Sequence, residues 1–118
     1  MFFRNAQHQE NFEKVLVIKP EMKNKEKIII YLLTSIPVVA ENLGEFYTII
    51  PKGDYEGYIE LDGIKKYSLS TGERMVVGVA FNLFNGFNIG EEITPYAIRS
   101  NVDKEVFKVY AEAIGMLA

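Results

Sequence analysis

The stretch Ser70-Thr-Gly-Glu-Arg-Met-Val-Val-Gly-Val-Ala-Phe-Asn-Leu-Phe-Asn-Gly86 decides how this chain folds. It opens on a capping box, in which the Ser70 hydroxyl and the Glu73 carboxylate each satisfy a backbone amide at the start of a helix. It closes on Gly86, the residue type that most often ends a helix. Because a helix that is apolar nearly all round is a buried helix, the sequence predicts a central buried helix over about 70–85.

Four positions interrupt the apolar run of this helix: Arg74, Gly78, Asn82 and Asn85. Their spacing of three or four residues places them on one face. Polar side chains on a buried helix need hydrogen-bond partners, so Arg74, Asn82 and Asn85 are candidate binding residues. The alternative is that the aromatic residues beside them pack the core and that Asn82 bonds a neighbouring backbone segment.

Helices are also predicted on both sides of the central one. Asn5 is a suitable N-cap for a first helix that ends before Pro20. Thr94-Pro95 predicts a short helix, and another begins near Asn101 or Asp103. The last one carries an apolar stripe with helical spacing, made of Val102, Val106, Val109, Tyr110, Ala113 and Leu117.

Two segments are ambiguous. Ile28–Leu33 is a short apolar run that suits a strand or a buried helix, and Asn24 as a cap with Pro37 after it favours a helix over 25–35. Residues 46–61 predict either a small β-hairpin or an ordered loop. The expected fold class is therefore mainly α: a compact single-domain bundle of about four helices around the buried central helix.

Composition indicates an ordinary globular domain. The 118 residues are 48% hydrophobic and 25% charged, which predicts one domain spanning residues 1–118. The net charge of −3 argues against a dedicated nucleic-acid-binding domain, and the charged segment Lys19–Lys27 is expected to be solvated surface. No secretory signal opens the chain, and the longest apolar run is far shorter than the roughly 20 residues that span a bilayer. A soluble, cytoplasmic protein is expected.

Residues that carry chemistry are scarce. The chain has no cysteine, and His8 is the single histidine, so no metal site and no cofactor are expected. No serine or threonine lies in a nucleophile motif, and the glycines match no phosphate-binding loop. An enzymatic activity is accordingly less expected than a non-enzymatic role, and no catalytic residue is assigned.

Several motifs nevertheless resemble a known family. His8-Gln-Glu-Asn-Phe-Glu13, the Ile30–Leu33 segment, Thr71-Gly-Glu-Arg74 and Ala80-Phe-Asn-Leu-Phe-Asn-Gly86 are similar to a family of small uncharacterised proteins from Gram-positive bacteria and their phages. The resemblance runs from Asn5 to about Pro95, and Tyr47–Lys66 departs from the family pattern. It implies a mainly helical fold, a cytoplasmic setting and a mobile-element origin, and it assigns no site residue.

Three functional hypotheses follow. The first is a non-enzymatic protein-interaction module, with an unknown protein partner or a homodimer. The second is a small-ligand binder or enzyme with a site around His8 and the Arg74/Asn82/Asn85 stripe. The third is weak nucleic-acid binding through the lysines Lys23, Lys25, Lys27, Lys65 and Lys66.

Overall fold

The computed structural model describes residues 1–117 and is mainly helical. Along the chain the elements are α1 (Ala6–Ile18), α2 (Asn24–Leu33), α3 (Pro37–Glu41), the 3-10 turn η1 (Leu43–Glu45), β1 (Tyr47–Thr48), β2 (Tyr58–Ile59), α4 (Asp62–Lys66), α5 (Thr71–Asn85), α6 (Pro95–Asn101) and α7 (Lys104–Gly115). The prediction of a mainly helical bundle with a small hairpin is confirmed. Its four longest helices in the described residues are α1, α2, α5 and α7.

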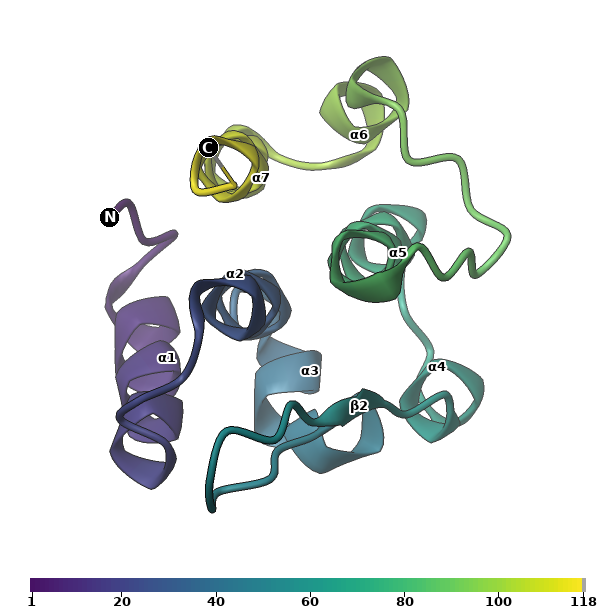
Figure 1. The fold of residues 1–118 in the computed structure, drawn as a ribbon. Coiled ribbons are helices and arrows are strands. Elements are labelled where there is room, and N and C mark those ends of the chain that lie inside the picture. Colours follow the sequence, from purple (N-terminus) through teal and green to yellow (C-terminus); the bar gives the residue numbers. More distant parts are fainter. Residues whose placement is uncertain (118) are drawn as a thin grey trace.

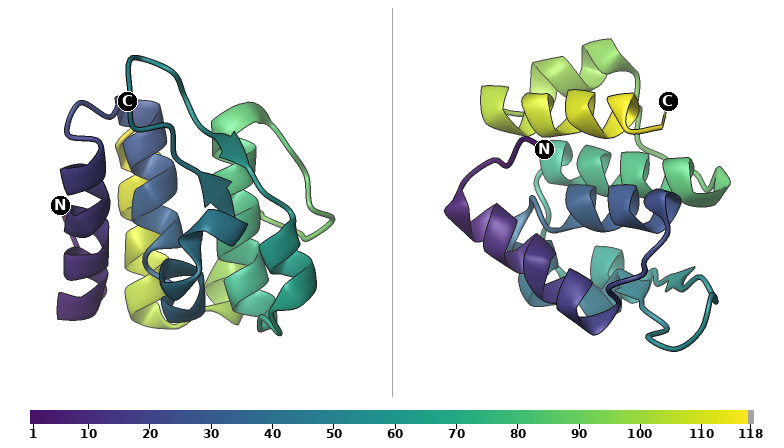
Figure 2. Two further views of the ribbon diagram at one scale, coloured as in Figure 1. Left: turned by 90° about the horizontal axis from the view of Figure 1, so that it is seen from below. Right: turned by 60° about the vertical axis from the view of Figure 1, so that its left-hand side comes forward.

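The helices are arranged around α2, which lies between α1 and α5 (Figure 1). The contact between α2 and α5 is the most extensive in the fold, and α7 packs on α2 from another side (Figures 1 and 2). The hairpin and α4 lie on the side of α2 and α5 that faces away from α7. The core is thus built around two adjacent helices instead of one.

The ambiguous segment Ile28–Leu33 is a helix, and it is the most deeply buried part of the molecule. Every one of its residues is at most 1% exposed. Complete burial explains why its sequence shows no amphipathic period, because no face of Ile28–Leu33 meets water. The predicted cap is wrong: α2 begins at Asn24 itself, and the Asn24 side chain donates to the Met116 carbonyl at 2.9 Å.

The central helix predicted over 70–85 is α5, and both of its ends are as expected. The capping box is formed by Ser70 and Glu73. Gly86 takes a left-handed conformation, with φ 81°, and its N–H donates to the Asn82 carbonyl at 2.8 Å. This conformation favours glycine because it costs a Cβ-bearing residue free energy.

The hairpin is confirmed as a two-stranded antiparallel pair, with Tyr47 opposite Ile59. Two short strands alone are marginally stable, and here Phe46 and Tyr47 anchor them in the core at 0% and 1% exposure. Gly57 lies so close to the first strand that a Cβ there would be 1.8 Å from the Thr48 carbonyl oxygen. Only glycine permits this approach.

The buried position of Phe81 on α5 gives the first prediction. Phe81→Ala should lower the free energy of unfolding by about 3–5 kcal/mol, because a fully buried ring is replaced by a cavity. Urea denaturation followed by circular dichroism measures the loss. The matched control is Phe87→Ala, which removes a ring that is 39% exposed and should cost much less. Equal losses for the two variants would contradict the central position of α5.

Candidate functional site

His8 is buried at 2% exposure on α1, and both of its ring nitrogens are occupied. Nε2 lies 2.8 Å from the Tyr31 carbonyl oxygen, and Nδ1 accepts the Arg4 N–H at 3.0 Å. The carbonyl can only accept and the amide can only donate, so the network assigns the proton to Nε2. His8 is therefore a neutral cross-link between α2 and the chain that precedes α1.

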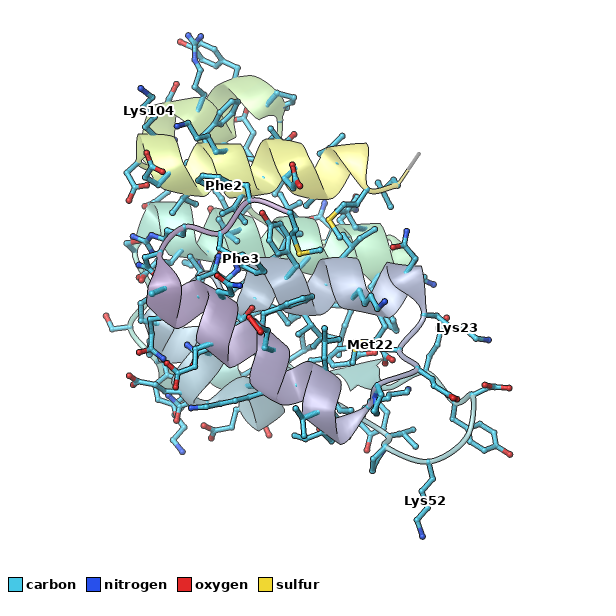
Figure 3. All side chains as sticks on the ribbon, turned by 90° about the vertical axis from the view of Figure 1, so that its left-hand side faces the viewer. Phe2, Phe3, Met22, Lys23, Lys52 and Lys104 are labelled. Carbon is cyan, nitrogen blue, oxygen red and sulfur yellow. The ribbon has the colours of Figure 1, made fainter. Side chains whose placement is uncertain are left out.

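The segment that His8 holds is an extended N-terminal arm, residues Met1–Arg4. The Tyr31 hydroxyl donates to the Phe2 carbonyl, and the Phe3 ring packs edge-on against His8 at 5.1 Å between centroids. The Arg4 guanidinium donates to the Ser35 carbonyl at 3.0 Å and pairs with Asp103 at 3.1 Å. Figure 3 shows Phe2 and Phe3 between α7 and α1. The arm thus ties three helices together.

The environment of His8 disfavours its protonated form. Burial lowers its pKa from the ordinary value of 6.5, the Arg4 charge lowers it further, and the bond to Tyr31 opposes both. Protonation would also place a second donor on Nδ1, opposite the Arg4 N–H. A group whose pKa is lowered by folding stabilises the fold above its unfolded pKa, and that stability is lost as the pH falls through the folded value.

We therefore predict an acid-sensitive contribution from His8. The free energy of unfolding of the wild type, minus that of His8→Gln, should fall as the pH is lowered below about 6.5. Glutamine can accept from Arg4 and donate to Tyr31 but does not titrate, so it is the matched control. Denaturation curves at a series of pH values measure the difference, and a difference independent of pH would contradict the assignment.

A second buried cluster joins the start of α2 to the hairpin. The Lys19 ammonium donates to Glu26 Oε1 at 2.8 Å and to the Tyr55 carbonyl at 2.7 Å. The other carboxylate oxygen of Glu26 accepts the Tyr47 hydroxyl and, at 2.8 Å, the Gly57 N–H. Burial alone would raise the pKa of Glu26, but the hydrogen bonds from Lys19, Tyr47 and Gly57 outweigh it and hold the pKa below its usual value.

This cluster corrects the expectation that Lys19–Lys27 is solvated throughout. Lys19 and Glu26 are 6% and 1% exposed. Sequence reasoning missed them because their partners, Tyr47 and Gly57, come from a distant segment of the chain. Every fully buried side-chain nitrogen or oxygen in residues 1–117 has a hydrogen-bond partner, so the cluster is satisfied as it stands. It fixes the hairpin to the helices.

Breaking this ion pair gives a further prediction. Glu26→Gln should destabilise the protein by about 3–5 kcal/mol, because it leaves the Lys19 ammonium buried without its counter-charge. The double variant Lys19→Met with Glu26→Gln should lose less than Glu26→Gln alone, since it removes the unpaired ammonium while the amide oxygen can still accept from Tyr47 and Gly57. Urea denaturation compares the two variants, and a single variant that unfolds like the wild type would refute the role of the pair.

Two residues of the polar stripe of α5, Arg74 and Asn85, have partners within the chain. Arg74 Nε donates to Glu91 Oε1 at 2.7 Å, and Ile89 and Ile93 pack against the bare backbone at Gly78. The loop 86–94 therefore folds back over this face of α5, as Figure 1 shows. Asn82 is half-buried beside it. Asn85 is exposed, and its side chain accepts the Phe87 N–H at 3.1 Å, which helps to end the helix.

The four candidate binding residues consequently lie in two places. Arg74, Asn82 and Asn85 share α5, and Arg74 and Gly78 face the loop 86–94. His8 faces α2 from the side of α1, and α2 lies between α1 and α5 (Figures 1 and 2). The structure does not bring the histidine and the α5 stripe around one cavity.

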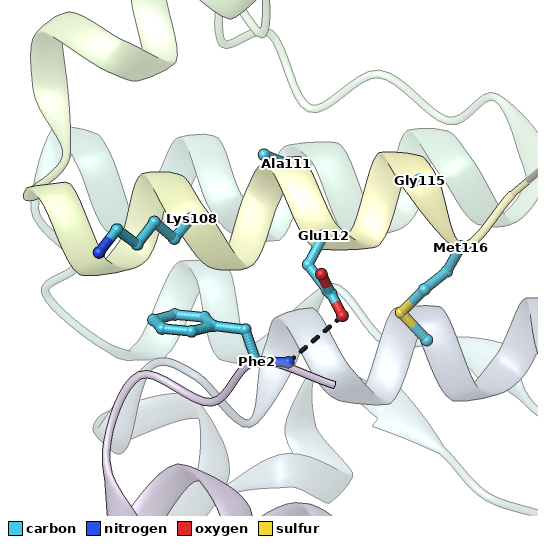
Figure 4. A pocket seen from close by; sticks show the side chains of 6 residues that line it. All are labelled: Phe2, Lys108, Ala111, Glu112, Gly115 and Met116. Atoms are coloured by element: carbon cyan, nitrogen blue, oxygen red, sulfur yellow. Dashed lines mark hydrogen bonds between the residues drawn. The ribbon is translucent and has the colours of Figure 1, made fainter.

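A different surface is hollowed, where the N-terminal arm meets α7 (Figure 4). We call it the arm–α7 groove. It is an open hollow of about 620 Å³, and its wall is mainly apolar. The residues that line it are Phe2, Lys108, Ala111, Glu112, Gly115 and Met116.

Phe2 forms one wall of the groove and is held by the two charged residues that line it. Its N–H donates to Glu112 Oε1 at 3.3 Å, and the Lys108 ammonium lies 5.7 Å from the centre of its ring. The same two elements also carry exposed apolar side chains: Met1 on the arm is 58% exposed and Ile114 on α7 is 41% exposed. A surface of this kind can bind another apolar surface.

The groove was not foreseen from the sequence. The predicted apolar stripe of the last helix is buried at Val106, Val109, Tyr110 and Ala113, but Leu117 is 49% exposed. The available signal was on the other face of that helix, where Ala111 and Gly115 stand four residues apart among charged residues. These small residues form part of a groove only because the N-terminal arm lies beside them, which no local pattern in the sequence indicates.

The part of the chain that the structure describes contains neither a cluster of metal-ligating side chains nor a helix that could span a membrane. Within residues 1–117, no cluster of three or more histidine, aspartate or glutamate side chains could hold a metal ion. None of the helices in the same range has the length and apolar character to cross a bilayer. The fold is that of a small, mainly helical protein with an open, mainly apolar hollow on its surface.

Comparison with known proteins assigns the family. Residues 1–116 match the family of unknown function DUF6075, and the chain belongs to that family. This agrees with the resemblance to uncharacterised proteins noted in the sequence. No curated protein and no solved structure matches the chain.

Proposed function

We propose that this protein is a non-enzymatic protein-interaction module that binds its partner in the arm–α7 groove. The observation that carries the proposal is the groove itself, an open, mainly apolar hollow whose two walls come from opposite ends of the chain. Open apolar surfaces that contain methionine adapt to protein partners, and Met116 lines this one.

The chemistry of the groove favours an amphipathic helix as the partner. The groove runs along α7, and Ala111 and Gly115 leave room for a second helix to lie close. Lys108 and Glu112 stand one turn apart beside these small residues. An antiparallel helix with an acidic and a basic residue one turn apart would place each charge opposite its complement.

The contacts within the chain support this function over ligand binding. His8 uses both ring nitrogens to hold the arm and α2, and Arg74 is paired with Glu91. Of the lysines considered for nucleic acid, Lys66 pairs with Glu45 at 2.8 Å and Lys25 lies 3.8 Å from Glu56. We further propose a cytoplasmic setting in a bacterium or its phage, following the family resemblance.

Site-specific photo-crosslinking tests the surface. A photoreactive phenylalanine analogue at Ala111, in the groove, should crosslink to a protein when the tagged chain is irradiated in its host cells. The matched control is the same analogue at Tyr58, a 53% exposed aromatic residue on the hairpin, which should not. Mass spectrometry of the crosslinked peptide identifies the bound segment. No adduct at position 111, or equal adducts at both positions, would overturn the proposal.

A further inference from the structure

We propose that the helix bound in the arm–α7 groove is α7 of a second copy of this chain, packed antiparallel about a two-fold axis near Tyr110 and Ala111. This inference rests on the proposed function, because it names the partner for the same surface. It makes the interface isologous, so that each copy supplies both the groove and the helix that fills it.

Charge complementarity on α7 supports this choice of occupant. Lys108 and Glu112 lie one turn apart, and both line the groove. In an antiparallel pair whose two-fold axis passes at the level of Tyr110, Lys108 of one copy faces Glu112 of the other. The two-fold symmetry also places Glu112 of the first copy opposite Lys108 of the second. The α7 helix of a second copy therefore supplies the acidic and the basic residue that the groove of the first copy would pair with. The partner chemistry deduced from the groove is therefore present in the chain itself.

The shape of the α7 surface also suits a symmetric helix pair. Its exposed stripe has helical spacing and contains Lys104, Lys108, Ala111 and Gly115. The two small residues fall at its centre and C-terminal end, and a Cβ at Gly115 would meet nothing within 4 Å. Two such helices can approach closely near the axis. The exposed Ile114 would then pack beside the stripe of the second copy.

The arm adds to this surface without blocking it. Phe2 lies on the same side of α7 as Glu112, where their hydrogen bond places it. The two-fold axis brings the Phe2 walls of both copies to the same side of the helix pair. The His8 network holds the arm in position, so the second copy meets a preformed wall.

Sedimentation equilibrium of the whole chain over the micromolar range, combined with charge exchange, tests the proposal. The wild type should dimerise reversibly. Lys108→Glu makes positions 108 and 112 both acidic, and Glu112→Lys makes both basic. Each cross-pair within either variant is then between like charges, so each variant alone should be monomeric. An equimolar mixture of the two should dimerise again, because every pairing is then opposite in sign.

Circular dichroism melts establish that both variants fold. Glu112→Lys also removes the acceptor of the Phe2 N–H, and recovery of the dimer in the mixture would show that this loss is not what prevents dimerisation. Dimers in the wild type and the mixture, with monomers in each variant alone, would establish the symmetric pairing. A monomeric wild type would overturn it, as would a mixture that stays monomeric. If the wild type is monomeric but position 111 still crosslinks to a different protein, the second copy is excluded and the proposed function stands.

Discussion

The packing of α2 on all sides is the constraint on which the rest of the structure depends. Ile28–Leu33 is excluded from water, and α1, α5, α7 and the hairpin region are arranged to exclude it. Burial of this much apolar surface supplies the main driving force for the fold. It also means that the neighbours of α2 must be held at fixed positions, since an opening on any side would expose the helix.

Polar contacts with α2 fix those positions. At its first turn, Glu26 gathers Lys19, Tyr47 and the Gly57 amide, and so attaches the hairpin. In its last turn, the Tyr31 backbone and side chain hold His8 and the N-terminal arm. Buried polar groups are costly unless they are fully hydrogen-bonded, and these are. Apolar packing therefore supplies the stability, and the two networks specify which segments cover α2.

The arm–α7 groove is a consequence of the second network. Phe2 forms a wall only because Tyr31, Glu112 and the neighbouring His8 contact hold the arm against α7. The surface proposed for binding is thus built from the two ends of the chain and positioned by its core. This arrangement links the single histidine to the interface without making it a binding residue, and it accounts for the burial of a titratable group.

Local signals in the sequence determined much of the fold. The capping box at Ser70, the Gly86 terminus, the Asn5 cap and the Thr94-Pro95 start all depend on residues within one turn of each other, so the sequence alone specifies them. Only the tertiary structure decided the features that depend on residues far apart in the sequence. The complete burial of Ile28–Leu33, the burial of Lys19 and Glu26, and the partners of His8 and Arg74 follow from segments that meet only on folding. The groove does too, because one wall comes from the first residues of the chain and the other from its last helix, and no local pattern records that they lie side by side.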